Sequence, residues 1–307
     1  MSLPPIIQNV ILAQKEFLDM AKKAKTKPKI WTYAMEEMSY PDVQVILKTT
    51  DGVLPIGSQE KHGPHVPLAT DSCATIETTI RAAEKAKVPC TPLIPVGYSP
   101  HHLGTVNDGI GTLSFTGETL RRIIYEIGKC LIFHGFNKLI YTSQHESNTK
   151  VTDEVLRRLR YETGCFCAWY ITPTERKTQV INDLLEEKIA WHSGEMETAQ
   201  CMDYDESCVH MERAKKHTAH APKWLGAAFH KTDGVPTVIF QGTENIFIPM
   251  EHQEYVAEAT VGDLFLASKG KGERIFERAS DKLAAFVNEV KKMKVTIKDR
   301  NYDFRAY

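Results

Sequence analysis

The sequence lacks a long hydrophobic run, which argues against a helix that crosses a membrane. No stretch approaches the roughly 20 consecutive apolar residues that such a helix needs. The first five residues, Met-Ser-Leu-Pro-Pro, do not resemble a cleavable leader peptide. We therefore expect a protein with no membrane partner that works in the cytoplasm.

An excess of charge of one sign is also lacking. The 38 Lys and Arg residues and the 39 Asp and Glu residues leave a formal net charge of -1. Such a chain has no overall field that would attract nucleic acid or a charged membrane surface. It also has no G-x-G-x-x-G segment after a predicted strand and no Walker-type phosphate loop. We expect neither a nucleic-acid partner nor a nucleotide cofactor.

Cysteine is present, but without the spacing of a disulfide framework. Among the seven cysteines, Cys165 and Cys167 form the only close pair. An odd count at irregular spacing favours reduced thiols, as in cytoplasmic proteins. The hydrophobic content of 42% and the charged content of 25% are ordinary for a globular enzyme.

Hydrophobic patterning predicts strands and helices in alternation. We expect strands at residues 53–56, 91–95, 138–142 and 165–171, and helices at 71–87, 116–134 and 151–162. This alternation is typical of an α/β protein whose mainly parallel sheet is covered by helices on both faces.

The flanking regions complete the prediction of a single domain of 307 residues. Helical spacing over residues 6–24 predicts an N-terminal helical extension of about 30 residues. Further on we expect a helix over 173–191, a strand or hairpin over 237–248, a final amphipathic helix over 273–293, and a polar tail over 294–307. No internal repeat or low-complexity linker divides the chain.

The densest chemistry lies in residues 54–71, where a short apolar run breaks into Gly, Pro, His and carboxylate residues. In α/β proteins, loops at the carboxyl ends of strands carry function because a rigid sheet holds them open to solvent. Glu60 and His62 alternate as in an extended segment, so both can point to one side. With Asp71 they form a suitable ligand set for a divalent transition metal. Alternatively, Asp71 caps the next helix and the other two are solvated loop residues.

Two further predicted strands end in loops that carry histidine. His101 and His102 follow the strand at 91–95, and His145 follows the strand at 138–142. Right-handed crossovers put the carboxyl ends of parallel strands at one edge of the sheet. We therefore expect these loops to meet the segment 54–71 in one crevice. The pair His101 and His102 could instead be structural.

The segment after the helix at 173–191 contains His192, Glu195 and Glu197. Clustered carboxylates are costly to bury unless they are paired or bound to metal. Either glutamate could also lie on the surface of a helix. The histidines between residues 204 and 231 show no ligand spacing and are expected at the surface.

These segments together resemble the creatininase (creatinine amidohydrolase) family. Residues 60–68 with Asp71 resemble the family's E-x-H-G-P-H-L-P-L…D signature, and residues 192–198 resemble its H-A-G-x-x-E-T segment. Other similar elements are residues 98–102, 111–114 and 134–136, and His145 with Asn148. The resemblance covers about residues 31–199. It implies a three-layer α/β/α sandwich and a homo-oligomer, commonly a hexamer.

The resemblance also implies a site with two divalent metal ions per subunit, Zn or Mn, with Fe as a further option. By position, Glu60, Asp71 and His145 would bind one ion. His62 and Asp71 would bind the second, so that Asp71 bridges the two ions. His192 would be the catalytic histidine.

The sequence departs from the family pattern around His145. Ser143 and Gln144 replace the usual Asn-Gly, and Ser147 stands where the family's namesake enzyme has a further glutamate ligand. We hypothesise that Glu195 replaces this ligand and also acts in catalysis. His101, His102 and Ser147 are the residues that we expect to contact the substrate.

Two adjacent divalent ions would make a water molecule reactive near neutral pH and polarise a carbonyl group, while His192 or a carboxylate moves a proton. The sequence thus predicts a metal-dependent hydrolase that opens a small cyclic substrate at an amide C–N bond. One alternative is hydrolytic C–C opening of a cyclic polyol ketone, such as an inositol-derived diketone. Others are an isomerase or lyase at the same centre, or a degenerate metal-binding interaction protein, which Ser147 suggests.

Overall fold

A parallel sheet of three strands forms the centre of the protein. The structure is a computed structural model that describes residues 30, 32–47, 51–172, 179–188, 192–231, 234 and 237–302. In the sheet, β1 (Asp51–Pro55) pairs with β2 (Lys138–Ser143), and β2 pairs with β3 (Phe166–Ile171). Both pairings are parallel, so the three strands end at the same edge.

The segment predicted as a strand over 91–95 runs beside β1 but does not form a regular strand. Two isolated parallel bridges connect them, Val53 with Cys90 and Ile56 with Ile94. Pro92 and Pro95 lack the N–H that a continuous ladder requires. The prediction is therefore right about where this segment lies and wrong about its regularity.

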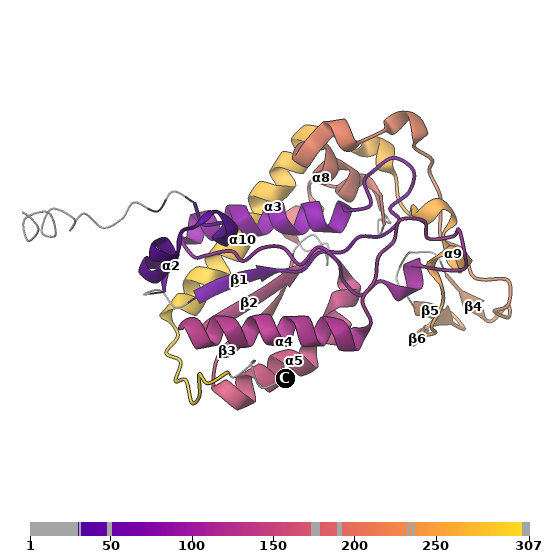
Figure 1. Ribbon diagram of the computed structural model, residues 1–307. Coiled ribbons are helices and arrows are strands. Elements are labelled where there is room, and N and C mark those ends of the chain that lie inside the picture. Colours follow the sequence, from indigo (N-terminus) through magenta and orange to yellow (C-terminus); the bar gives the residue numbers. More distant parts are fainter. Residues whose placement is uncertain are drawn as a thin grey trace, which may run out of the picture.

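Helices cover both faces of the sheet (Figure 1). The helices α3 (Thr70–Ala86) and α10 (Lys269–Lys292) lie on one face. The helices α4 (Gly117–His134) and α5 (Glu146–Thr163) lie on the other. The expected three-layer α/β/α sandwich is confirmed.

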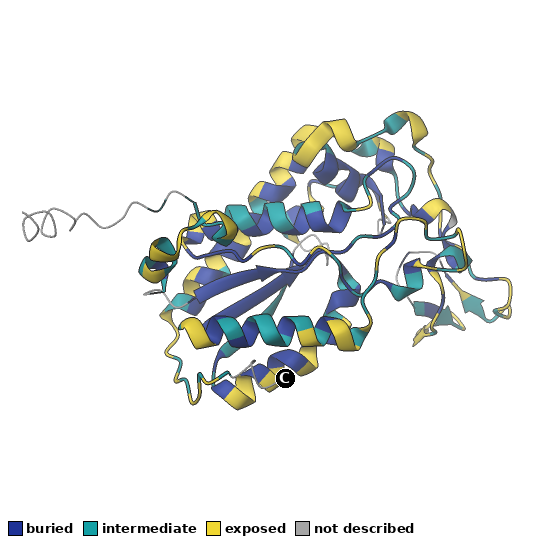
Figure 2. Cartoon of the chain, viewed as in Figure 1, coloured by how far each residue is buried: buried dark blue, intermediate teal, exposed yellow. Residues whose placement is uncertain are grey.

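The core follows from the alternation of side chains along the strands. Val53 and Ile140 pack with apolar residues of α3 and α10. Leu54, Leu139 and Tyr141 point the opposite way and pack with α4 and α5. Figure 2 shows β1 and β2 buried throughout and the helices buried where they face the sheet, whereas β3 at the edge is only partly buried. Full burial of each large apolar side chain stabilises the fold by roughly 1.5–3 kcal/mol.

A second, smaller sheet lies beyond the carboxyl ends of the main strands (Figure 1). It consists of β4 (Phe229–His230), β5 (Thr237–Phe240) and β6 (Glu244–Phe247), all antiparallel. The prediction for residues 237–248 is confirmed in its hairpin form. The short helix α9 (His252–Tyr255) follows β6. We call residues 219–231 and 237–261, which share a small apolar core, the small-sheet unit.

Shorter elements connect these parts. They are η1 (Met35–Glu37), α2 (Tyr40–Ile46), η2 (Pro100–His102), α7 (Gln179–Asn182), α8 (Glu195–Asp205), η3 (Glu206–Cys208), η4 (Met211–Arg213), η5 (Ala257–Ala259) and η6 (Leu264–Leu266). Of the helix predicted over 173–191, the described residues contain only α7. The helix predicted over 6–24 lies outside the described residues. In the predicted tail, Arg300 donates hydrogen bonds to the carbonyl groups of Ile132 and Phe136. No helix in the described ranges is long and apolar enough to span a bilayer.

Candidate metal centre

Five side chains that lie far apart in the sequence converge beyond the ends of β1 and β2. Glu60 lies within 3.4 Å of His145, and Asp71 lies 3.2 Å from the same ring nitrogen, Nδ1. His62 Nε2 is 3.6 Å from Asp71 Oδ1, and His192 Nε2 is 3.2 Å from Glu60 Oε1. All five residues are buried. The structure thus brings together the side chains that the sequence placed in one crevice.

Two overlapping groups of side chains in this cluster have the composition of metal sites. One contains Glu60, Asp71 and His145, and the other contains His62, Asp71 and Glu197. Within each group, the potential ligand atoms lie within 4.8 Å of one another. Asp71 belongs to both groups, so its two carboxylate oxygens could bridge two ions. Carboxylate and imidazole ligands suit Zn and Mn.

The hydrogen bonds of the two histidines leave one nitrogen of each ring free to face the centre. His62 Nδ1 lies 3.1 Å from the carbonyl oxygen of Glu60, and His145 Nε2 lies 3.0 Å from that of Tyr98. A carbonyl can only accept, so we assign the proton of each neutral ring to these nitrogens. The lone pairs of His62 Nε2 and His145 Nδ1 then point at the carboxylates, as in histidines that bind metal.

Unpaired atoms in the cluster also fit a bound cation. Among the described residues, His62 Nε2 and Asp71 Oδ2 are buried without a hydrogen-bond partner. A buried polar atom without a partner costs roughly 1–3 kcal/mol. Coordination of an ion would satisfy both atoms, so the residues present fit a divalent metal.

Without an ion, the cluster balances its charges with protons. Burial raises the pKa of Glu60, but His145 and His192 outweigh this effect and the pKa falls to about 2. Burial lowers the pKa of His62, but Asp71 and its neighbouring carboxylates raise it to about 10. The pKa of His145 likewise rises to about 9, because Glu60 and Asp71 outweigh its burial. A bound cation would take the place of these protons.

Asp71 does not serve as a helix cap. The helix α3 begins at Thr70, and its N-cap residue, Ala69, has no side chain that could accept a hydrogen bond. Asp71 is therefore inside the first turn, where its carboxylate is directed at His62 and His145. The alternative in which Asp71 only caps the helix is wrong.

Close packing fixes the loop that carries Glu60 and His62. Ser72 Oγ accepts a hydrogen bond from the N–H of Ser58 and donates one to its carbonyl oxygen. A Cβ atom at Gly57 would lie 2.1 Å from Ser72 Oγ, so the approach of the loop to α3 requires glycine.

Asn148 joins the three loops that form the site. Its Oδ1 accepts a hydrogen bond from the N–H of Tyr98 at 2.9 Å. Its Nδ2 donates to the carbonyl oxygen of Gly57 and to Ser143 Oγ, at 2.9 and 3.1 Å. Asn148 is fully buried. The meeting of the loops is thus fixed by direct bonds.

The first turn of α8 places Glu197, and not Glu195, at the centre. Residues two positions apart on a helix point roughly 200° apart. Glu197 Oε2 lies 3.8 Å from His62 Nε2 and accepts a hydrogen bond from the N–H of Ser193 at 2.6 Å. Burial raises the pKa of Glu197.

The hypothesis that Glu195 replaces the missing ligand is corrected by its contacts. Its carboxylate forms an ion pair with Lys271 and accepts hydrogen bonds from the N–H groups of Glu186 and Glu187 at 2.8 and 2.7 Å. It is fully buried on the side of α8 that faces α10, so it is available neither as a ligand nor for catalysis. The signal for Glu197 was present in the sequence, because Glu197 is the residue that matches the glutamate of H-A-G-x-x-E-T.

The backbone around His192 is constrained by the small-sheet unit. His192 forms an antiparallel bridge with Val261, and its Nδ1 lies 2.9 Å from the carbonyl oxygen of Ala259. Ser193, Glu258 and Ala259 have φ angles of 52°, 55° and 52°. Such conformations cost of order 1–3 kcal/mol each and persist only where the surroundings impose them.

The other predicted substrate contacts border the centre. His102 Nε2 lies 3.4 Å from Glu60 Oε1, and the ring of His101 stacks at 6.4 Å from that of His145. Burial lowers the pKa of His101 to about 4 and lowers the pKa of His102 well below its usual value, so both are neutral at pH 7. Ser147 is buried in the first turn of α5. His252 also lies in this region, and no sequence motif indicated it.

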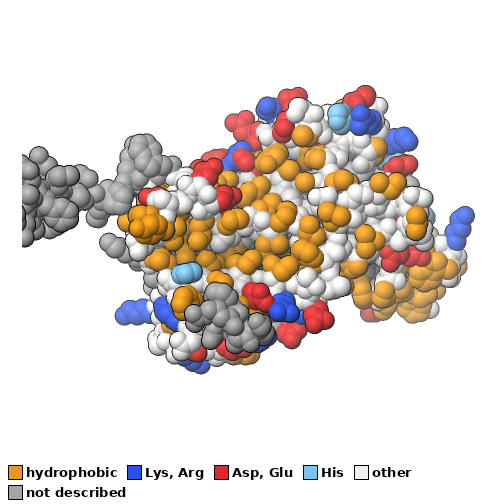
Figure 3. Space-filling view, viewed as in Figure 1, with side chains coloured by type: hydrophobic (Ala, Val, Ile, Leu, Met, Phe, Trp, Pro, Cys, Tyr) orange, Lys and Arg blue, Asp and Glu red, His pale blue; other side chains and the backbone are white. Residues whose placement is uncertain are grey.

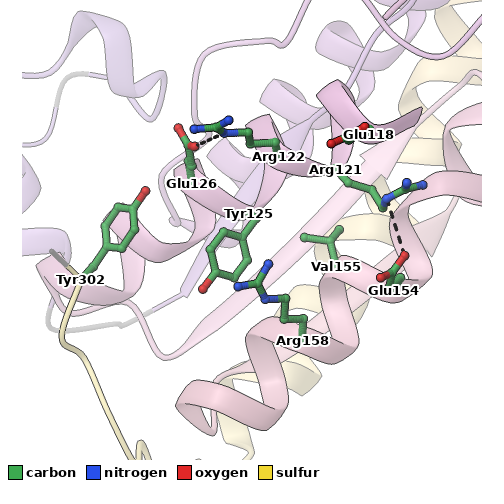
Figure 4. A pocket seen from close by; sticks show the side chains of 9 residues that line it. All are labelled: Glu118, Arg121, Arg122, Tyr125, Glu126, Glu154, Val155, Arg158 and Tyr302. Atoms are coloured by element: carbon green, nitrogen blue, oxygen red, sulfur yellow. Dashed lines mark hydrogen bonds and ion pairs between the residues drawn. The ribbon is translucent and has the colours of Figure 1, made fainter. Parts of the chain in front are cut away.

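A separate surface pocket between α4 and α5 does not have the chemistry of an active site (Figure 4). Arg122 pairs with Glu126, and Arg121 pairs with Glu154. Arg158 lies over the ring of Tyr125. The arginines of this pocket are therefore engaged with neighbouring side chains.

The comparisons with known proteins agree on one family. The family model Creatininase, described as creatinine amidohydrolase, matches residues 36–287. Creatinine amidohydrolase of Pseudomonas putida is 25% identical over 270 residues, which are 82% of this chain and 95% of that protein. Mycofactocin precursor peptide peptidase of Mycobacterium ulcerans is 29% identical over 119 residues, 36% of this chain and 46% of that protein.

Solved structures show the same fold. A putative creatinine amidohydrolase from Bacteroides fragilis NCTC 9343 has a TM-score of 0.70 at 21% identity, covering 87% of this chain and 99% of that one. Two creatininase structures, a manganese form and a mutant of the Zn-Zn type, each have a TM-score of 0.68 at 23% identity. They cover 85% and 86% of this chain and 100% of their own.

Proposed function

The chain belongs to the creatininase family of hydrolases, and on this premise we propose that it opens a small cyclic substrate at an amide C–N bond. The observation that carries the proposal is the pair of ligand groups that share Asp71. We assign one divalent ion to Glu60, Asp71 and His145, and a second to His62, Asp71 and Glu197. The zinc and manganese forms of the similar creatininase structures support Zn or Mn as the metal.

When bound, two divalent ions would activate a water molecule as nucleophile and polarise the substrate carbonyl. The chain contributes orientation and proton transfer. His192 Nδ1 donates to the carbonyl of Ala259, which fixes the ring and leaves Nε2 at 3.2 Å from Glu60. From this position Nε2 can accept the proton that the water loses and deliver it to the leaving nitrogen. The hydroxyl of the water then ends on the carbonyl carbon and its hydrogen on the nitrogen.

The burial of the side chains at the centre further favours the reaction, because bulk water is kept away from the reacting groups. The six assigned residues are each less than one-tenth exposed. In such surroundings charges interact more strongly than in water, which helps to stabilise the charge that develops on the carbonyl oxygen.

Hydrolysis of a linear peptide amide is a second candidate. It is favoured by the similarity to the mycofactocin precursor peptide peptidase, although that match covers only 46% of the relative. Opening of a cyclic polyol ketone remains a further option for the same centre. The alternative of a degenerate metal-binding protein loses its main support, because both ligand groups keep three potential ligands without a carboxylate at Ser147.

A substrate screen tests the proposal. Purified protein is analysed for metal and then incubated, with Zn²⁺ or Mn²⁺, with cyclic amides such as creatinine, hydantoin and dihydrouracil, cyclic polyol ketones, and short linear peptides. Mass spectrometry should detect the gain of one water by a cyclic amide, and Asp71→Ala should abolish both metal binding and turnover. A product of unchanged mass would indicate an isomerase or lyase. Two bound ions without any turnover would contradict a hydrolase.

We also propose a cytoplasmic homo-oligomer, with a hexamer as the expected size. Hydrophobic side chains gather on the face between α3 and α4 (Figure 3). In the loop that follows η2, Val106 and Ile110 are 89% and 70% exposed. Exposed apolar surface of this kind favours association. Light scattering coupled to size exclusion should give a mass several times that of one chain, and the mass of a single chain would refute this.

A further inference from the structure

Three buried histidines form a group beside the proposed metal centre. They are His102 from η2, His192 before α8 and His252 from α9. The ring centroid of His252 lies 4.3 Å from that of His102 and 4.6 Å from that of His192. Three separate parts of the chain therefore bring imidazoles to one point. Neither His102 nor His252 belongs to the two ligand groups that contain Asp71.

His252 is buried without a hydrogen bond. It is 3% exposed, and its ring contacts are with the rings of His102, His192 and Tyr255. Within the described ranges, no side chain or backbone group pairs with either of its ring nitrogens. His102 Nδ1 is a fully buried atom without a hydrogen-bond partner, whereas the ring nitrogens of His252 are not among the fully buried unpaired atoms of the described residues. Such an atom costs roughly 1–3 kcal/mol, which a ligand that supplies the missing partner to His102 would recover.

The structure holds His252 rigidly in this position. Gln253, its neighbour on α9, donates a hydrogen bond to the carbonyl oxygen of His102 at 3.2 Å. Glu251 accepts one from the N–H of Gly104, also at 3.2 Å. Trp224 of the small-sheet unit donates to Glu254 at 2.7 Å. A polar group that is fixed but unpaired is suited to bind a ligand with little loss of entropy.

The balance of charge decides between a third cation and an uncharged ligand. Glu60, Asp71 and Glu197 bring three negative charges to the centre. Two divalent ions already exceed these by one positive charge, and a third would raise the excess to three. The histidine group brings no carboxylate of its own. Because buried uncompensated charge is costly, this excess disfavours a third cation, and the imidazoles can instead form hydrogen bonds with an uncharged group.

We propose that His252 is a substrate-binding residue that forms a hydrogen bond with an uncharged group, a carbonyl, hydroxyl or amide, of the substrate held at the metal centre. The proposal rests on the proposed function, because it requires a substrate at that centre. It assigns substrate recognition to the small-sheet unit, whose segment 237–261 carries His252. His252 would be the residue through which this unit contacts the substrate.

Three variants of the metal-loaded full chain test the proposal. His252→Phe keeps the packing of the ring but removes its hydrogen bonds, and His252→Gln keeps a donor and an acceptor. His230→Phe, at an exposed histidine of β4, is the control. For the cyclic compound that wild type hydrolyses fastest in the screen, His252→Phe should lower kcat/KM about tenfold or more, chiefly through KM. His252→Gln should restore part of the loss, and His230→Phe should match wild type.

Metal content and thermal midpoint are measured on each variant, to separate binding from structure. We expect two ions in wild type and in all three variants. If His252→Phe does not fold, His252→Leu takes its place in the comparison with His252→Gln. An unchanged kcat/KM in the variant that lacks the hydrogen bond would overturn the proposal. So would the loss of an ion, since His252 would then belong to a cation site. Wild type that binds metal but hydrolyses nothing would overturn the proposed function, and this inference with it.

Discussion

Glu195 and Glu197 are two positions apart, and the turn of α8 directs them to opposite sides. Glu197 lies at the proposed metal centre, whereas Glu195 is paired with Lys271 of α10. Each carboxylate also accepts backbone N–H groups, which fix its orientation. Chemistry and stability are therefore separated between two residues of the same type.

Neutralising either glutamate should separate these roles. Glu197→Gln should reduce the metal content from two ions toward one and abolish turnover, with little change in stability. Glu195→Gln should keep both ions but lower the free energy of unfolding by about 3 kcal/mol, because it breaks a buried ion pair. Metal analysis and urea unfolding of both variants check this. Loss of metal from Glu195→Gln alone would reverse the assignment.

Metal binding should release protons. The pKa values of His62 and His145, about 10 and about 9, mean that both rings are protonated at pH 7.5 in the metal-free protein. An ion binds only the neutral ring, so uptake should release about two protons and metal affinity should rise with pH up to about 9–10. Calorimetric titration of Zn²⁺ in buffers of different protonation enthalpy measures the number. A heat that does not depend on the buffer would contradict the prediction.

At the scale of elements, the site is held by the places where helices begin. Asp71 and Glu197 lie in the first turns of α3 and α8, and His145 directly precedes α5. Asn148, in the first turn of α5, connects the start of that helix to two other loops. Such bonds maintain the distances between ligands that come from different elements.

Asn148→Ala should weaken metal binding indirectly, because it removes the hydrogen bonds that hold the loops of the site together. The change leaves the N–H of Tyr98 and the carbonyl of Gly57 without their partner, which should cost about 2–4 kcal/mol of unfolding free energy. Metal affinity should fall about tenfold, because the loops are no longer held together. Asn245→Ala, in exposed β6, serves as the control. Wild-type affinity in Asn148→Ala would show that packing alone fixes the loops.

For the whole molecule, the proposed ions should connect parts of the chain that are distant in sequence. Glu60, His145 and Glu197 come from three different regions of the chain, so the two ions that bind them stabilise the folded state alone. Each ion at a thousand times its Kd adds about 4 kcal/mol. Removal of metal with a chelator should thus lower the thermal midpoint by several degrees, and added Zn²⁺ or Mn²⁺ should restore it. Calorimetric scans check this, and an unchanged midpoint would exclude ions at this position.

The sequence by itself determined the layers of the fold and the first half of the site. Alternating strands and helices specify a parallel sheet, and its topology brings Glu60, Asp71 and His145 to one edge. Both features follow from the local periodicity of apolar residues and from the right-handed connections between parallel strands. Irregularity in the segment 91–95 could also have been expected, because its prolines cannot pair.

Only the tertiary structure decided what depends on the docking of distant parts. Local pattern gives the helix that carries Glu195 and Glu197, but which of the two faces the centre depends on where α10 and its Lys271 pack. His252 belongs to no motif, and it reaches the centre because the small-sheet unit docks on η2 and on the segment around His192. A periodic pattern shows which side chains share a face, whereas packing between elements decides what that face meets.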